Sequence, residues 1–182
     1  MKTSLIVTLL GEDRPGLVSL VASRTTAAGG NWLESHMAQW AGRFAGVLRL
    51  EVVDPEAADR LEAVLLGLEA EGLQVVVERG LDVVPPMRHR VQMELIGHDH
   101  PGIVQDISAV LARHGVSIDT LETGCEPASM SGEPLFRARA TLGMPAETSL
   151  HDLQDDLESL ANELMVDLDL HDSDAAEAST SD

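Results

Sequence analysis

The sequence predicts an α+β protein made of two similar halves, each with the element order β-α-β-β-α-β. The pattern Gly-x-Asp-x-Pro-Gly-[Leu/Ile]-Val occurs at residues 11–18 and again at residues 97–104, an offset of 86 residues (97 − 11). Both copies follow an apolar run typical of a strand and precede apolar residues at helical spacing. A repeat at this offset in a chain of 182 residues predicts two tandem domains.

Elements of the first half are expected in the order of the chain. Pro15 suits the first turn of a helix, and the glycine pair 29–30 ends it. Ala41-Gly42 suits a two-residue hairpin turn, while a second helix is expected to start at Pro55 and to end at Gly72. The strands expected in this half are residues 5–10, 31–40, 43–53 and 75–77.

The second half repeats this order with a longer hairpin loop at residues 126–134. Helices are expected at residues 103–111 and 150–164, and strands at residues 91–96, 116–123, 135–142 and 166–170. Each half is therefore expected to form a ferredoxin-like unit, a four-stranded antiparallel sheet with two helices on one face. The predicted boundaries are a first domain at 1–84, a linker at 85–90, a second domain at 91–170 and a disordered acidic tail at 171–182.

Composition restricts the partners of the chain. With 31 acidic and 12 basic residues the net charge is −19, which opposes direct binding to nucleic acid. A basic protein partner remains possible, and an acidic proteome is an equally good explanation of the charge. No apolar run is long enough to span a membrane, and the single cysteine, Cys125, indicates a reducing, cytoplasmic location.

The repeated pattern is suited to binding a small anion. Gly16 and Gly102 leave the first helical turn bare, so a carboxylate could approach the backbone N–H groups there. Asp13 and Asp99 are expected to cap those helices. The structural alternative is equally open, because capping aspartates, a helix-starting proline and glycines for tight packing would give the same pattern.

These residues resemble the ACT domain, a small ligand-sensing module. The resemblance rests on residues 13–18 with Gly30-Asn31-Trp32, and on residues 99–104 with residues 115–118. Two tandem copies without a catalytic domain resemble the glycine cleavage system transcriptional repressor family. The resemblance implies a cytoplasmic homodimer that senses a small amino acid, with glycine as the first candidate. It also implies control of transcription through a LysR-type activator protein, without direct contact to DNA.

The ligand-binding residues implied by the resemblance come from the first strand-to-helix loop and from the start of the second strand. In the first half they are Asp13, Arg14, Gly16, Leu17 and Asn31; in the second half they are Asp99, His100, Gly102, Ile103, Val104, Ser117 and Ile118. The second half is expected to hold the ligand, because Ser117 and Ile118 leave more room than Asn31 and Trp32. Ser117 departs from the asparagine usual in this family, and Trp32 from the usual small aliphatic residue.

No pattern for catalysis, for a cofactor or for a metal ion stands out. His98 and His100 flank Asp99 on a turn, and Cys125 has no recognisable nucleophile motif around it. We therefore expect a protein that is not an enzyme. Two other functions fit the sequence: an allosteric subunit that binds a metabolic enzyme in trans, and an interaction module without ligand whose pockets are filled by its own side chains.

Overall fold

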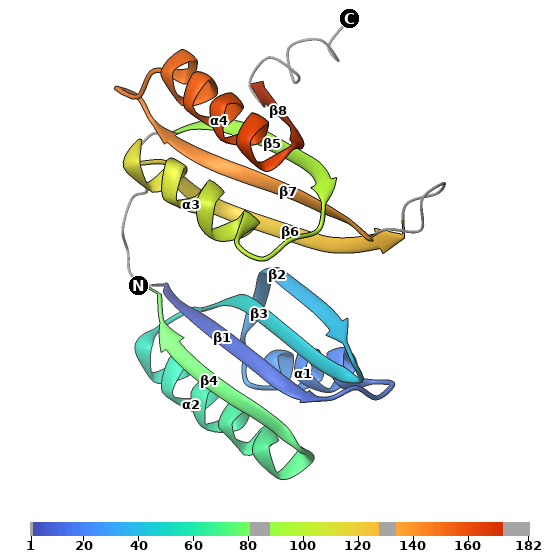
Figure 1. Ribbon diagram of the computed structural model, residues 1–182. Helices are drawn as coiled ribbons and strands as arrows, with labels where there is room; N and C mark the ends of the chain where they lie inside the picture. Colours follow the sequence, from blue (N-terminus) through green and yellow to red (C-terminus); the bar gives the residue numbers. More distant parts are fainter. Residues whose placement is uncertain (1, 81–87, 128–133, 173–182) are drawn as a thin grey trace, which may run out of the picture. The chain divides into compact units, whose positions relative to one another are not determined.

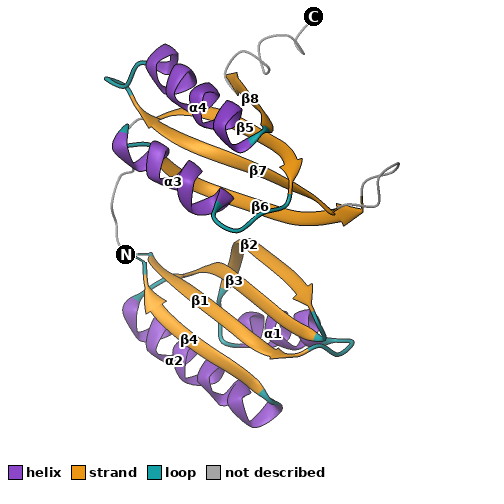
Figure 2. Cartoon of the chain, in the orientation of Figure 1, coloured by secondary structure: helices purple, strands orange, loops and turns teal. Residues whose placement is uncertain are grey.

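The chain forms two compact units, residues 1–83 and 84–182, each with its own hydrophobic core. The computed structural model describes residues 2–80, 88–127 and 134–172. In each unit two helices lie on one face of an antiparallel sheet (Figure 1, Figure 2). The predicted α+β fold, two ferredoxin-like units in tandem, is confirmed.

The first sheet has the strand order β2-β3-β1-β4. Its elements are β1 (Thr3–Glu12), α1 (Leu17–Ala27), β2 (Asn31–Trp40), β3 (Arg43–Val52), α2 (Pro55–Leu66), the 3-10 helix η1 (Gly67–Glu71) and β4 (Leu73–Arg79). Asp54 caps α2, with its carboxylate accepting a 2.7 Å hydrogen bond from the Ala57 N–H.

The second sheet has the matching order β6-β7-β5-β8. Its elements are β5 (Arg88–His98), α3 (Ile103–Arg113), β6 (Ser117–Pro127), β7 (Pro134–Pro145), α4 (Leu150–Leu164) and β8 (Val166–Asp172). Both sheets carry a bulge at equivalent positions of their edge strands, Leu33 in β2 and Asp119 in β6, again 86 residues apart (119 − 33).

Two predicted boundaries differ from the structure. Residues 88–90, expected in the linker, open β5 and pair with residues 143–145 of β7. His171 and Asp172, expected in the tail, extend β8 and pair with Gln92 and Val91. Polar residues join a sheet through their backbone groups, so a boundary placed where the apolar run ends falls short. Residues 85–87 of the linker, 173–182 of the tail and 128–133 of the hairpin loop lie outside the described residues.

The hairpin turn of the first half is of the predicted two-residue type. Ala41 and Gly42 both have positive φ, +48° and +77°, as a type I′ turn requires. This turn aligns β2 and β3 over their whole length apart from the bulge at Leu33.

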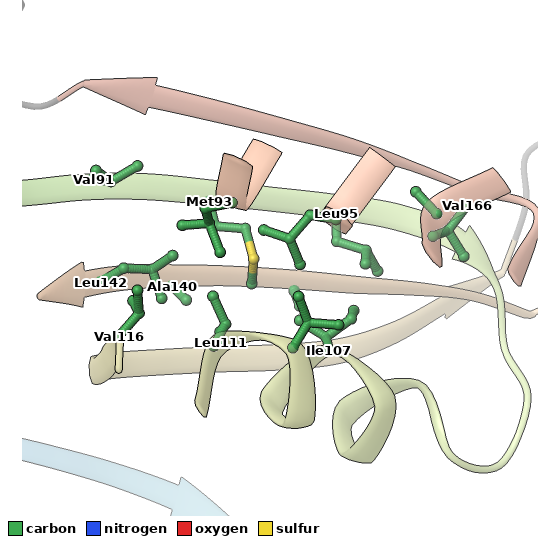
Figure 3. Close-up of a cluster of buried hydrophobic side chains, with 14 of the residues drawn as sticks. Val91, Met93, Leu95, Ile107, Leu111, Val116, Ala140, Leu142 and Val166 are labelled. Atoms are coloured by element: carbon green, nitrogen blue, oxygen red, sulfur yellow. The ribbon is translucent and has the colours of Figure 1, made fainter. Parts of the chain in front are cut away.

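Each core lies between the sheet and its two helices. Figure 3 shows Met93 and Leu95 of β5 pointing toward Ile107 and Leu111 of α3, and all four are buried. A fully buried side chain of this size contributes about 1.5–3 kcal/mol relative to an exposed one. The helices cover only one face of each sheet. Every second residue of a strand therefore points away from the helices, toward the open face of the sheet. No described helix has the length and apolar character needed to cross a membrane.

Candidate functional site

The first glycine of each repeated pattern is required by packing between strands. A Cβ atom on Gly11 would lie 2.7 Å from Leu73 Cδ2, and one on Gly97 would lie 2.3 Å from Val166 Cγ1. Leu73 and Val166 are the first residues of β4 and β8. Glycine therefore lets the last strand of each unit start against the first one.

The second glycine of each pattern is required by the backbone at the start of α1 and α3. Gly16 and Gly102 are the N-cap residues, with φ of +92° and +104°, a region that costs other residues about 1–2 kcal/mol. Neither helix has a side-chain cap. The expectation that Asp13 and Asp99 cap these helices is wrong, because each lies three residues before its N-cap.

The N–H groups of the first turn of α1 are consequently open to a ligand. The first hydrogen bond of α1 runs from the Leu20 N–H to the Gly16 carbonyl, at 2.8 Å. The N–H groups of Leu17, Val18 and Ser19 precede it and have no acceptor within the helix. In α3 the first bond runs from the Asp106 N–H to the Gly102 carbonyl, at 2.9 Å. Both helix N-termini can therefore accept a carboxylate.

Each strand-to-helix loop is held against the hairpin of its own sheet. The Asp13 N–H donates to the Gly42 carbonyl at 2.9 Å, and the Asp99 N–H donates to the Pro134 carbonyl at 3.2 Å. The far end of the second strand therefore lies beside the loop, and its start does not.

The start of the second strand lies at the opposite end of the sheet. Asn31 pairs with Glu51, which pairs with Ser4, so Asn31 is level with Ser4 and the loop follows Glu12. Roughly eight residues along a strand correspond to about 26 Å. This separation arises because α1 runs antiparallel to β1 and carries the chain back to the end of the sheet where β1 begins.

The second half shows the same separation. Ser117 pairs with Gly143 and is level with Arg90, whereas the loop follows His98. Within one domain the structure therefore does not bring together the two groups of predicted ligand-binding residues. The small Ser117 and Ile118, on which the expectation of a ligand in the second half depends, therefore lie far from the loop of their own domain.

The residues at the strand starts are engaged locally. The Ser117 hydroxyl accepts a hydrogen bond from the Arg88 guanidinium and donates to the Asp119 carboxylate at 3.1 Å. Ile118 pairs with the buried Leu142 and is 36% exposed. Trp32 is partly buried and packs against the first core, so its ring belongs to the core and not to the loop.

The charges around the two loops differ. Arg14 donates to the Glu71 carbonyl at 2.8 Å, and its guanidinium is also ion-paired with the Glu71 carboxylate at 3.9 Å. The first turn of α1 has no acidic residue. In the second loop His100 replaces Arg14, and α3 has Asp106 in its first turn. Asp106 Oδ2 lies 3.5 Å from the position of a Cβ on Gly102. This carboxylate already offsets the positive end of the α3 dipole.

Cys125 lies beside the second loop, which the sequence did not indicate. Desolvation by neighbouring atoms raises the pKa of the exposed Cys125 thiol, and the negative charge of the nearby Asp99 raises this pKa further. A raised pKa keeps the thiol protonated and weakly nucleophilic. The strand register produces this proximity, because Cys125 pairs with Phe136 and Phe136 pairs with Gly97. Within the described ranges, no group of three or more His, Cys, Asp or Glu side chains is placed to hold a metal ion.

Comparison with known families identifies both units. Residues 3–78 match one model of the ACT domain, and residues 91–164 match a second. The chain belongs to the ACT-domain family, with two copies in tandem. This tandem ACT protein is 25% identical to the glycine cleavage system transcriptional repressor of Escherichia coli (strain K12), over 162 residues that make up 88% of this chain and 85% of the relative.

Solved structures share the tandem ACT architecture along most of the chain. An unknown protein from Galdieria sulphuraria matches with a TM-score of 0.79 and 28% identity, covering 94% of this chain and 99% of the other. A putative glycine cleavage system transcriptional repressor matches with a TM-score of 0.70 and 21% identity, covering 94% and 97%. At this identity the second match bears on the fold alone.

Proposed function

We propose that this tandem ACT protein is an amino-acid-sensing regulator that controls transcription of glycine cleavage genes through a protein partner. The observation that carries the proposal is the similarity to the E. coli repressor across both domains, over 88% of the chain. The net charge of −19 supports action without direct DNA contact. The proposal includes glycine as the ligand, a LysR-type activator as the partner, and a cytoplasmic homodimer.

The ligand-binding element we propose is the N-terminus of α1 with its preceding loop. The ligand carboxylate would accept hydrogen bonds from the N–H groups that follow Gly16, and the ligand ammonium group would face Asp13. Leu17 is buried beneath this turn and Val18 is 47% exposed beside it. A Cβ on Gly16 would meet no atom within 4 Å, so the approach to the backbone is open.

Electrostatics favours the first loop over the second. A carboxylate at α1 meets a first helical turn without an acidic residue, whereas at α3 it meets the Asp106 carboxylate. A charge at a helix N-terminus is worth about 0.3–1 kcal/mol at an exposed site, and Asp106 takes up this contribution in α3.

The experiment compares two matched variants, Val18→Asp and Val104→Asp. The two valines occupy equivalent positions in α1 and α3 and are 47% and 43% exposed. Each substitution adds a carboxylate to a first helical turn, which favours the helix, so loss of ligand response would not come from unfolding. The measurement is the thermal shift of the full chain with each common amino acid.

Glycine at about 100 times its dissociation constant should stabilise the wild-type fold by about 2.7 kcal/mol. Val18→Asp should abolish this response and Val104→Asp should retain it. Loss in Val104→Asp alone would assign the ligand to the second loop, and retention in both variants would exclude both helix N-termini. If no amino acid shifted the wild-type protein, amino-acid sensing would be refuted.

The partner is tested separately with a LysR-type activator encoded beside the glycine cleavage genes. The full chain should shift the activator–operator complex in a gel and leave the operator alone unshifted. A shift of the operator without activator would refute the partner-mediated mechanism.

A further inference from the structure

The open faces of the two sheets differ in character. On the first sheet the outward-pointing Leu10, Trp40, Val47 and Val76 are 43%, 73%, 47% and 56% exposed. Their outward direction follows from the register, since Thr8, between the buried Val7 and Leu9, pairs with both Val47 and Val76. Trp40 pairs with Arg43, next to the buried Phe44, and so points to the same side. We call this surface, defined by Leu10, Trp40, Val47 and Val76, the apolar sheet face.

The second sheet has charged residues at the places equivalent to Thr8, Val47 and Val76, and keeps an apolar residue, Ile96, at the place of Leu10. Glu94 takes the place of Thr8 and pairs with Arg139 and Asp169, which stand where the first sheet has Val47 and Val76. Arg139 and Glu94 form an ion pair at 3.2 Å. The fold therefore accepts charge at these positions, and exposed valines in the first sheet are not a requirement of folding. Exposed apolar surface of this kind marks an interaction site.

We propose that the apolar sheet face is the homodimer interface and packs against the same face of a second copy of this chain. The inference specifies the surface of the homodimer that the proposed function includes, and it does not depend on the identity of the ligand. Two antiparallel sheets pack in this way about 10 Å apart, with their apolar side chains interdigitated.

The size of the face suits a second copy. Four strands about 4.8 Å apart, with strands of seven to ten residues, give a face of roughly 19 by 24–34 Å. Two copies would bury roughly 900–1,300 Å² in total, which reaches the about 1,000 Å² that a specific interface needs. Trp40 lies at the hairpin end of this face, and tryptophan is enriched among residues that dominate binding energy.

Charge also favours a second copy over a charged partner. The outward-pointing Arg49 forms an ion pair with Glu34 at 2.9 Å, and Arg43 lies opposite Glu12 in the register. Both arginines of the face therefore have an acidic neighbour within the same copy. Glu78 also points to this face, beside Ile6, but it lies on the edge strand β4. A chain with a net charge of −19 therefore meets its copy with least repulsion over the central strands, where the arginines are compensated.

The test is the oligomeric state of the full chain, measured by sedimentation equilibrium over a range of concentrations. Val47→Arg and Val76→Asp insert the residues that the second sheet has at these positions. Leu66→Arg is the matched control, because Leu66 is 40% exposed on α2, on the helical side of the sheet. Circular dichroism and the melting midpoint check that each variant is folded.

The wild type and Leu66→Arg should sediment as dimers of the 19.5 kDa chain. Val47→Arg and Val76→Asp should each weaken dimerisation by roughly 30-fold or more, as loss of a dominant interface residue does. A wild type that stays monomeric at all concentrations, or a dimer that both variants retain, would overturn the proposal. A monomer that binds another protein through Val47 would also overturn the proposal, because that protein and not a second copy would then occupy the apolar sheet face. The amino-acid thermal shift is read on the same variants, so a failure of this interface is distinguishable from a failure of sensing.

Discussion

Replacement of Thr25 by valine should stabilise the first domain by about 1–2 kcal/mol. Thr25 lies in α1 and is 1% exposed, and its Oγ1 is buried without a hydrogen-bond partner in the part of the chain that the structure describes. A buried hydroxyl left without a partner costs about 1–3 kcal/mol, because the unfolded chain hydrates it. Valine has nearly the same shape and a similar helix propensity, so the substitution removes this penalty and little else.

The assay is urea denaturation followed by tryptophan fluorescence. Both tryptophans, Trp32 and Trp40, belong to the first domain, so the signal reports on the domain that carries the change. The slope of the unfolding free energy against urea concentration should stay constant. In a thermal melt, each 1 kcal/mol of added stability should raise the melting midpoint by about 4–8 °C in a domain of this size.

Thr25→Ser is the control for this prediction, because it keeps the hydroxyl and deletes the methyl group, which lies close to Gly30. It should destabilise the domain by about 1 kcal/mol. If Thr25→Val left stability unchanged or lowered it, the hydroxyl would have a partner in solution and the reasoning would be refuted.

Three further predictions follow from single positions. Met165 ends α4 with a φ of +54° and is 81% exposed, so Met165→Gly should stabilise the second domain by about 1 kcal/mol in calorimetry; a lower melting temperature would contradict this. The pH midpoint for alkylation of Cys125 should lie above that of an ordinary cysteine thiol, because desolvation and the Asp99 charge raise the thiol pKa. Asp99→Asn should move this midpoint to lower pH, and an unchanged midpoint would exclude Asp99 as a cause. The full chain alone should give no gel shift with operator DNA at physiological salt, whatever the operator sequence.

The 86-residue offset carried most of the fold prediction. It predicted two domains of the same element order, and the structure repeats the offset in a feature that the sequence did not show, the bulges at Leu33 and Asp119. The turn at Ala41-Gly42 was predictable because only a few residue pairs suit a two-residue hairpin. The early start of β5 at Arg88 was not predictable from hydropathy, because its polar residues pair through the backbone alone.

The candidate site was predicted less well, because sequence patterns give local chemistry and not distance. Gly16 and Asn31 are 15 residues apart (31 − 16), yet α1 and the antiparallel sheet place them at opposite ends of the domain. Cys125 and Asp99 are 26 residues apart (125 − 99), yet they lie close enough for the Asp99 charge to raise the pKa of the Cys125 thiol. The strand register determines both the separation of Gly16 from Asn31 and the proximity of Cys125 to Asp99. The sequence does not reveal this register where no short turn fixes it.

The glycines of the repeated pattern are weak evidence for ligand binding, because the fold alone explains why they occur in both domains. Gly11 and Gly97 are fixed by contact with the last strand, and Gly16 and Gly102 by positive φ. These demands are equal in both domains, so they would keep the pattern in a domain that binds nothing. Evidence for function must therefore come from positions where the domains differ although the fold allows either choice.

Position 20 is such a place, since the first turn of α1 ends at Leu20 whereas α3 has Asp106 at the equivalent position. Position 47 is another, since Val47 is exposed where the second sheet has Arg139. The two differences are independent, because one lies at a helix N-terminus and the other on the opposite side of the sheet. Both favour the first domain, one for receiving a carboxylate and the other for meeting a second copy. Val18→Asp and Val47→Arg should therefore separate the two activities, each variant losing one and keeping the other.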